Sequence, residues 1–382
     1  MSPQSSPCFI IGGNHHNSLG VIRSLGEKGI KPNVIIQCEE KIPYIGKSKY
    51  INNSWIVKTN DEVIHILKQQ GKSIAQKSIL IACSDNLSSL IDLHHNELNQ
   101  WFLLPGAAEQ GRITYLMDKE VMSNLAREVG FLVPSSVAVN TITTKQINIS
   151  FPWIIKPLLS KNGQKSDIER IYSDSEWDDY CKRHEAQVQI QQLIDKDYEY
   201  QLIGLSLNGG EKVIIPGLSY VIRPAETTNT GFLHYIPLTD TYNAIVEKGK
   251  QFLKATGYSG LFSLEFLRGK DGKDYFMEIN FRNDGNAICV TASGVNLPYI
   301  WFLNQTGGDY EGEIAKSTVK SVYVMPEFED IRLLKQCKLD FVTWLKDIHR
   351  TDRFMEYDKH DMIPFFYLFK DFCVRGIKKL FH

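Results

Sequence analysis

The sequence lacks an excess of charge of either sign. Lysine and arginine together number 43 and aspartate and glutamate 44, which leaves a formal net charge of -1. A chain with so little net charge has no overall field that would draw it to nucleic acid or to an anionic membrane surface. We therefore expect no nucleic-acid partner, and any site for a polyanion must be built locally.

Other patterns are absent as well. The seven cysteines include no C-x-x-C pair, so the sequence predicts neither a zinc knuckle nor a disulfide framework. No basic segment precedes the first short apolar run, and no stretch reaches the roughly 18 to 20 apolar residues that a membrane span needs. These absences predict a cytoplasmic protein with reduced thiols.

The patterns that are present begin with an α/β unit. With 382 residues, 43% of them hydrophobic, the chain is long enough for two or three structural units around a shared site. The expected strands and helices of the first unit are a strand over 8–13, a helix over 18–28, a strand over 32–37, a helix over 61–70 and a strand over 78–83. This order predicts a Rossmann-like parallel sheet, whose ligands bind at the carboxyl ends of the strands.

The glycine-containing turn after the first strand differs from a dinucleotide-binding fingerprint. Its spacing is wrong and no acidic residue closes the second strand, which argues against a nicotinamide cofactor. His15 and His16 follow this turn. Adjacent residues cannot easily face one ligand, so we expect a capping or solvated role, with an acceptor-site role as the alternative.

Strand-forming residues become more frequent after a predicted helix near 117–129, which ends before Gly130 and Pro134. From Phe151 onward the sequence predicts strands over 153–156 and 170–173, a helix over 176–185, and then antiparallel strands up to residue 236. This part of the chain is expected to form an α+β unit.

The segment 260–285 carries the most informative pattern. It predicts two strands joined by a tight turn at 271–272. Glu265 lies within the first apolar strand, and Glu278 and Asn280 share one face of the second. Carboxylates in such surroundings are costly unless cations neutralise them.

Magnesium explains this pattern chemically. Mg²⁺ takes oxygen ligands from carboxylates and substrate phosphates, and Glu278 is placed to bridge two such ions. Arg282 extends the same face, where a guanidinium can neutralise charge on a phosphoryl group in transfer. An ordinary strand with a Glu278–Arg282 salt bridge is the alternative, and the second carboxylate, Glu265, on the neighbouring strand argues against it.

This arrangement resembles the metal site of the ATP-grasp superfamily, in which one strand carries a carboxylate and the next an E-x-N pair. The matching metal ligands are Glu265, Glu278 and Asn280. The resemblance covers about residues 8 to 310 and implies an ATP-grasp fold of α/β and α+β class, with a Rossmann-like domain, a small α+β lid and a larger antiparallel-sheet domain. It also implies ATP and two Mg²⁺ ions as cofactors, with Mn²⁺ as an expected substitute, and a catalytic contact between Arg282 and phosphate.

Further segments look like the family's nucleotide-binding motifs. Asp118 and Lys119 resemble its D-K helix start; a lysine there is unfavourable without a phosphate partner, although a solvated surface lysine is the alternative. Lys156 ends an apolar strand and matches the lysine that reaches the nucleotide phosphates. The next loop stands where relatives have a glycine-rich flap, and which of Lys161 and Lys165 contacts ATP stays open, with Lys165 as our candidate.

Residues 188–199 resemble the family's hinge, which holds the adenine edge and the ribose. The residues expected at the adenine are Gln191, Gln192, Leu193 and Ile194. Many relatives have glutamate where Gln191 or Gln192 falls, but a glutamine oxygen can also accept a hydrogen bond from the adenine amino group. Glu199 is the candidate for the ribose.

Two more features complete the predicted site. Arg223 is a catalytic candidate, because a basic side chain there could stabilise an acyl-phosphate or bind a carboxylate; a salt bridge is the alternative. Residues 283–294 look like the loop and helix that close the acceptor pocket in relatives. The expected domains are 1–115 (Rossmann-like), 116–195 (lid), 196–325 (metal and phosphate subdomain) and 326–382 (C-terminal helical extension).

Residues 364–382 are aromatic and basic with helical spacing. We favour a helix that docks on the body of the protein. The alternative is a helix at a membrane interface, with Arg375, Lys378 and Lys379 toward the lipid headgroups.

The opening of the chain and the S-K-Y at 48–50 are similar to a bacterial subgroup of predicted carboxylate-amine ligases, in the neighbourhood of D-aspartate ligase. This resemblance implies an enzyme that phosphorylates a carboxylate with ATP, releases ADP and joins the acyl group to an amine, in envelope, peptide or exopolysaccharide synthesis. Its partners would be small-molecule carboxylates and amines, and a homodimer is compatible with the family. The alternatives are a bicarbonate-activating carboxylase or carbamoyl-phosphate-type enzyme, and an ATP-binding regulatory protein without turnover.

Overall fold

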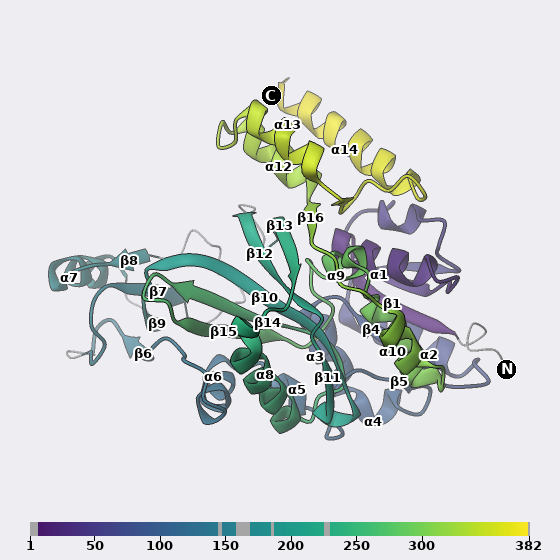
Figure 1. Cartoon of the computed structure of the whole chain (residues 1–382), viewed down its shortest axis with the longest axis horizontal. Coiled ribbons are helices and arrows are strands. Elements are labelled where there is room, and N and C mark those ends of the chain that lie inside the picture. The colour runs from purple at the N-terminus through teal and green to yellow at the C-terminus, as the bar shows by residue number, and fades with distance from the viewer. Residues whose placement is uncertain (1–6, 144–146, 158–168, 185–186, 225–229, 381–382) are drawn as a thin grey trace. The chain divides into compact units, whose positions relative to one another are not determined.

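The structure is a computed structural model that describes residues 7–143, 147–157, 169–184, 187–224 and 230–380 (Figure 1). The chain divides into two compact units. The first comprises residues 1–125, 200–265 and 278–382, and the second comprises residues 126–199 and 266–277. This division groups the predicted N-terminal domain, most of the larger sheet and the C-terminal section, and it places the tip of the 260–285 hairpin with the predicted lid.

The first unit begins with a parallel sheet of order β3-β2-β1-β4-β5. Its strands are β1 (Cys8–Gly13), β2 (Asn33–Gln37), β3 (Ser54–Val57), β4 (Ser78–Ala82) and β5 (Phe102–Leu103). The accompanying helices are α1 (His16–Gly26), η2 (Ile45–Lys47), α2 (Asn60–Gly71), α3 (Asp85–Leu93), α4 (His95–Leu98) and α5 (Arg112–Leu116). The Rossmann-like sheet predicted from the sequence is therefore confirmed.

Both faces of this sheet are buried, as a doubly wound fold requires. Along β1 the side chains alternate between two cores: Cys8 and Ile10 belong to one, Phe9 and Ile11 to the other. The chain leaves β1 toward β2 on one side and later adds β4 on the other. The loops that follow β1 and β4 therefore diverge, and this topological switch point is where ligands bind in such sheets.

A second, larger sheet has the order β15-β14-β10-β12-β13-β16-β17, and β11 pairs with β10. Its strands are β10 (Lys196–Leu207), β11 (Lys212–Ile214), β12 (Gly217–Pro224), β13 (Gly231–Pro237), β14 (Gly260–Gly269), β15 (Asp274–Asn280), β16 (Val322–Met325) and β17 (Arg353–Phe354). Helical segments between them are η4 (Asn208–Gly210), η5 (Asp240–Tyr242), α8 (Asn243–Thr256), α9 (Ile288–Ser293), α10 (Leu297–Thr306) and α11 (Tyr310–Lys316). The predicted turn between β14 and β15 contains Gly272 at a φ of 76°, which a glycine adopts without strain.

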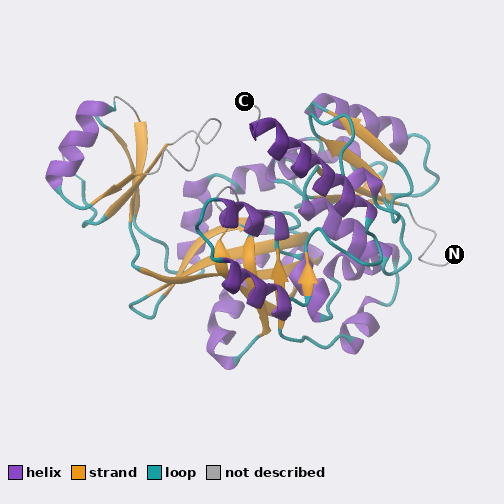
Figure 2. Ribbon diagram, turned by 90° about the horizontal axis from the view of Figure 1, so that it is seen from above, coloured by secondary structure: helices purple, strands orange, loops and turns teal. Residues whose placement is uncertain are grey.

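The second unit contains a four-stranded antiparallel sheet of order β6-β9-β7-β8. Its elements are α6 (Lys119–Glu128), which begins in the first unit, β6 (Ser136–Asn140), β7 (Trp153–Pro157), β8 (Glu169–Ile171), α7 (Asp174–Arg183) and β9 (Gln187–Gln192). In Figure 2 one helix lies against this small sheet, where Trp177 packs edge-on to Trp153 with ring centroids 5.9 Å apart. Helix α7 begins two residues before the predicted start because the Ser173 side chain caps it.

The C-terminal section contains α12 (Glu327–Lys335), α13 (Phe341–Arg350) and α14 (Ile363–Leu380). Helix α14 packs on α12, where Phe365 and Phe372 lie 5.6 and 5.5 Å from the Phe328 ring centroid. Phe366 and Phe369 are exposed. The side chains of residues 375–380 lie outside the described part, which includes the predicted headgroup contacts of this helix.

None of the helices in the described ranges combines the length and the hydropathy that crossing a membrane would need.

Candidate active site

The structure brings the predicted hairpin residues together at one end of β14 and β15. The Glu265 carboxylate accepts hydrogen bonds from Asn280 Nδ2 (2.9 Å) and Gln201 Nε2 (3.0 Å). Arg282 Nη2 donates to Asn280 Oδ1 at 2.9 Å. The predicted row of alternating residues is therefore a connected polar network between neighbouring strands.

Burial raises the pKa of Glu265 well above its ordinary value, and the negative charge of nearby Glu278 raises it further. Two carboxylates in this position cannot both ionise cheaply unless a cation joins them. Carboxylate and amide oxygens suit Mg²⁺, so the donor set of Glu265, Glu278 and Asn280 fits this ion. In the described ranges no three His, Cys, Asp or Glu side chains gather as metal ligands, so substrate oxygens would have to complete the coordination.

Arg282 links this hairpin to the first sheet. Its guanidinium binds both carboxylate oxygens of Asp85, at 3.0 and 3.1 Å, and one oxygen of Asp284 at 3.1 Å. Burial works against the charge of Arg282, but Asp284 and Asp85 outweigh it and hold its pKa above the ordinary value. The guanidinium is thus fixed in a charged state at the switch point of the sheet.

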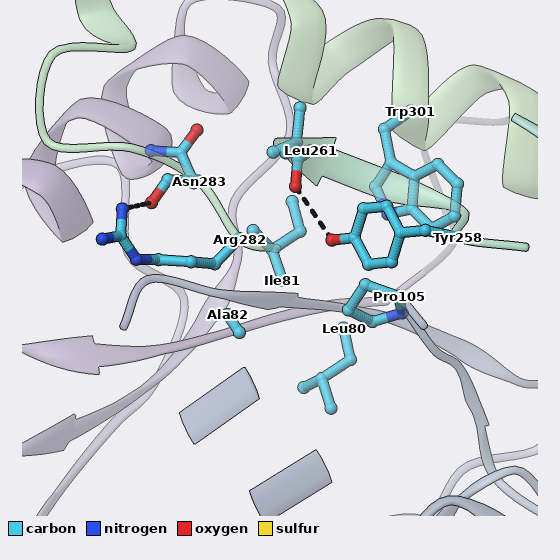
Figure 3. Close-up of a pocket in the computed structure, with 9 residues that line it drawn as sticks. All are labelled: Leu80, Ile81, Ala82, Pro105, Tyr258, Leu261, Arg282, Asn283 and Trp301. Atoms are coloured by element: carbon cyan, nitrogen blue, oxygen red, sulfur yellow. Dashed lines mark hydrogen bonds between the residues drawn. The ribbon is translucent and has the colours of Figure 1, made fainter. Parts of the chain in front are cut away.

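A small void lies behind this arginine, and its walls are largely apolar (Figure 3). Leu80, Trp301 and Tyr258 contribute to the wall, and the Tyr258 hydroxyl donates to the Leu261 carbonyl at 2.8 Å. The volume of about 10 Å³ is at the lower limit for a single water molecule. The void is therefore too small to form a substrate site.

The larger cavity, of about 330 Å³, is lined by residues of the first unit, including Glu265 and Arg282 of the network. The loops after β1 and β4 form one wall with His15, Ser84 and Asp85. The rest of the lining includes Thr230 and Glu265, together with Arg282 and residues shortly after it. This volume suits a small organic ligand, and the lining is polar on both sides.

Several polar residues of this site were not singled out from the sequence, although Asp284 and Asn286 lie within the predicted pocket segment 283–294. Asp284 accepts from Ser263 Oγ at 3.0 Å, and Asn286 Nδ2 donates to Gln201 Oε1 at 2.8 Å. Asn17 Nδ2 donates to two backbone carbonyls, those of Cys83 and Asn283, at 2.9 Å each. Asn17 lies in α1 and Asp284 and Asn286 lie in the loop after β15, so no strand pattern marks them and the sequence gives no signal for their partners.

Lys119 lies at the first residue of α6 and is exposed. Asp118 caps this helix, because its Oδ1 accepts from the backbone N–H groups of Glu120 (2.9 Å) and Val121 (3.1 Å). The predicted D-K pair is thus a helix start in which the aspartate is the cap and the lysine is free to reach outward.

The predicted nucleotide residues of the second unit lie on its central strands. Lys156 Nζ donates to Gln191 Oε1 at 2.7 Å across β7 and β9. The backbone N–H groups of Gln192 and Leu193 donate to Ser135 and Pro152 carbonyls, at 2.8 Å each.

Ile194 follows β9 in the same unit, beside the backbone of the hairpin tip at Gly269. Glu199 is about half exposed and accepts from Lys196 at 2.9 Å. Lys161 and Lys165 lie outside the described residues. Every described nucleotide candidate apart from Lys119 therefore belongs to the second unit.

Arg223 does not join the cavity lining. Its guanidinium binds Asp330 and Asp347 of α12 and α13, and it lies over the Phe232 ring with 5.0 Å between the guanidinium carbon and the ring centroid. Because Arg223 is paired with these two carboxylates and does not line the cavity, its contacts support the salt-bridge alternative.

Comparison with curated proteins finds distant relatives. A D-aspartate ligase from Enterococcus faecium is 21% identical over 257 residues, which is 62% of this chain and 61% of that protein. A formate-dependent phosphoribosylglycinamide formyltransferase from Bacteroides thetaiotaomicron is 21% identical over 194 residues, 48% of this chain and 50% of that protein. The matched segments thus span less than two thirds of these relatives. No protein-family model matches the chain.

Comparison with solved structures finds closer agreement in fold. The L-amino acid ligase from Bacillus licheniformis superposes with a TM-score of 0.62 at 16% identity, over 83% of this chain and 79% of that one. The N5-carboxyaminoimidazole synthetase from Staphylococcus aureus gives 0.60 at 14% identity, over 79% and 78%. The biotin carboxylase from Campylobacter jejuni gives 0.60 at 16% identity, over 78% and 71%. At these identities the likeness concerns the fold.

Proposed function

Since this chain has the fold of the ATP-grasp superfamily, we propose that it is a magnesium-dependent, ADP-forming ligase that activates a carboxylate as an acyl-phosphate and joins it to an amine. One observation supports this proposal most strongly. The Glu265, Asn280 and Arg282 network borders a polar cavity of about 330 Å³ at the switch point of the first sheet. The residues proposed for phosphoryl transfer thus border a cavity of a size that suits a small organic molecule.

Different residues of the chain would bind the metal ions and the parts of ATP. Glu265, Glu278 and Asn280 would hold Mg²⁺, which when bound neutralises phosphate charge and orients the group in transfer. Lys119 and Lys156, with Lys165 as a further candidate, would bind the ATP phosphates.

Gln191, Gln192, Leu193 and Ile194 would bind the adenine, and Glu199 the ribose. Arg282 would place its positive charge beside the phosphoryl group, where a fixed cation stabilises developing charge. Positioning of the two reactants supplies most of the remaining rate.

The amine half of the proposal is supported by the relatives. The D-aspartate ligase and the L-amino acid ligase are both named as ligases of amino acids, and their likeness to this chain supports an amine nucleophile. Amino acids are therefore the first acids and amines to be tested. A role in envelope, peptide or exopolysaccharide synthesis is compatible with this chemistry.

A bicarbonate-activating enzyme is the second candidate, because a biotin carboxylase and a carboxyaminoimidazole synthetase share the fold. Bicarbonate has only four non-hydrogen atoms, whereas the cavity of about 330 Å³ lies in the range of pockets for larger organic ligands. The cavity volume therefore favours an organic acid.

The test is ADP release by the purified protein with ATP and Mg²⁺ in the presence of separate pools of amino acids, small carboxylic acids, sugar acids and bicarbonate. We expect turnover that depends on one organic acid pool. Glu278→Gln should lower this turnover by at least about 100-fold, since it removes a charge from the proposed metal site.

Glu247→Gln is the matched control, because Glu247 is an exposed glutamate of α8 that pairs with Lys250 of the same helix and does not line the cavity. This variant should keep the wild-type rate. Turnover with bicarbonate alone would support the second candidate, and ATP binding without turnover in any pool would support a regulatory protein.

A further inference from the structure

A carboxylate, an imidazole and a hydroxyl group from three distant segments form a line that ends at the cavity. His16 Nδ1 lies 3.3 Å from Glu356 Oε1, and His16 Nε2 lies 3.3 Å from Thr230 Oγ1. All three residues are at most 5% exposed. They come from the start of α1, the residue before β13 and the segment after β17, all within the first unit.

Gly285 keeps the hydroxyl end of this line open. A Cβ atom at Gly285 would lie 2.9 Å from Thr230 Oγ1 and 3.7 Å from His16 Nε2, which is too close to the hydroxyl for an unshifted side chain. Thr230 and Gly285 both line the cavity. A molecule in the cavity can therefore approach the Thr230 hydroxyl, while His16 and Glu356 stay behind it.

We propose that Thr230, His16 and Glu356 form a proton relay that deprotonates the amine nucleophile in the second half of the reaction. This inference rests on the proposed function. Thr230 is the catalytic residue in this scheme, because its hydroxyl would touch the amine, and His16 and Glu356 are positioning residues that act through it.

The protonation states agree with such a relay. Burial lowers the pKa of His16 to about 4, against the raising effects of Glu329 and Asp284, so the ring is neutral and can accept a proton. Burial raises the pKa of Glu356 to about 7. When Glu356 is ionised it accepts the Nδ1 hydrogen of His16, which leaves Nε2 as the acceptor for the Thr230 hydroxyl.

The charged and titratable groups around the relay come from α1, α12, the loop after β15 and the neighbouring histidine: Arg23, Glu327, Glu329, Arg332, Asp284 and His15. Glu329 and Asp284 favour protonation of the relay, whereas the side-chain hydrogen bond with Glu327 and the charges of Arg23 and Arg332 favour ionised Glu356. The relay thus lies in a mixed field in which a proton can be held or released near neutral pH.

The step balances in atoms and charge. The amine reaches the site as an ammonium ion and loses one proton to the Thr230 oxygen as the Thr230 proton moves to His16 Nε2. The Nδ1 proton then moves to Glu356. The amine nitrogen bonds to the acyl carbon, the bond from that carbon to the phosphate oxygen breaks with its electron pair, and the second nitrogen proton leaves with the phosphate.

The test compares two nucleophiles with the same acid pool. Hydroxylamine is a free base at neutral pH and needs no relay, whereas an amino acid amine must first lose a proton. Thr230→Val should lower amide formation by about 100- to 1,000-fold and leave hydroxamate formation near the wild-type rate. Thr230→Ser keeps the hydroxyl and should restore most of the amide rate.

Glu356→Gln adds a readout that a purely structural role would not change. In the wild type we expect the amide rate to fall as pH drops below about 7, when Glu356 takes up a proton, and this dependence should disappear in the variant. Equal loss of amide and hydroxamate in Thr230→Val, or an unchanged pH profile in Glu356→Gln, would overturn the relay. Wild-type protein that releases no ADP with any acid pool would instead overturn the proposed function, and the relay with it.

Discussion

Arg23 is a single buried residue that anchors the segment around Glu356 to helix α1. Its side chain is 1% exposed in α1, where Nε donates to Asp361 Oδ2 at 3.1 Å and Nη2 donates to the Glu356 and Asp361 carbonyls at 2.9 Å each. Asp361 also accepts from the Ser48 hydroxyl at 2.8 Å. A buried charge is tolerated only when it is paired and hydrogen-bonded in this way. The backbone of Glu356 is therefore held directly against the helix that begins with His16.

Glu356 itself should make the stability of the protein depend on pH. Its pKa rises from 4.5 to about 7 on folding, so the folded state binds its proton more tightly than the unfolded state. This stabilisation is complete below about pH 4.5 and is lost as the pH rises through about 7. The shift corresponds to at most about 3 kcal/mol.

Glu356→Gln removes this dependence. We expect the melting temperature of the variant, measured relative to that of the wild type, to increase between about pH 5 and about pH 8. His16 has a lowered pKa and acts in the opposite direction, but it is present in both proteins and largely cancels in the comparison. A difference in melting temperature that stays constant over this pH range would show that burial does not raise the pKa of Glu356.

Among the elements, the hairpin of β14 and β15 was predictable because its signals are local. A period of two residues places Glu278, Asn280 and Arg282 on one face, and the turn residues are contiguous in the sequence. Helix ends were less predictable, because side-chain caps such as Ser173 before α7 decide them. The mistaken start of α7 by two residues is of this kind.

Helix α6 offers a test at the same scale. Asp118→Ala removes the acceptor for two backbone N–H groups and should lower the free energy of unfolding by about 1 kcal/mol in urea titrations. Asp118→Asn retains a capping oxygen and should stay within a few tenths of a kcal/mol of the wild type, by the near-equal preference of the two residues at this position. Equal losses in both variants would mean that the charge of Asp118, and not its cap, supports the helix.

Across the whole molecule, the sequence predicted the fold, and it predicted that the residues of one half of the candidate site lie together. The contiguous motif from Glu265 to Arg282 could be read directly, and the order of strands and helices indicated the parallel sheet. The other half depends on contacts between distant residues, such as Arg282 with Asp85 and His16 with Glu356. No local pattern specifies such pairs, which is also why the sequence could not decide between the two roles of Arg223.

The central claim for the molecule is that the γ-phosphoryl group of ATP passes to a carboxylate oxygen. The most direct measurement supplies the active acid pool with ¹⁸O in its carboxyl groups and analyses the released phosphate by mass spectrometry. Our account predicts one ¹⁸O atom in each phosphate, because the carboxylate oxygen that attacks phosphorus leaves with it when the amine displaces it. Phosphate without ¹⁸O would mean that water attacks ATP, and would contradict the proposed ligase.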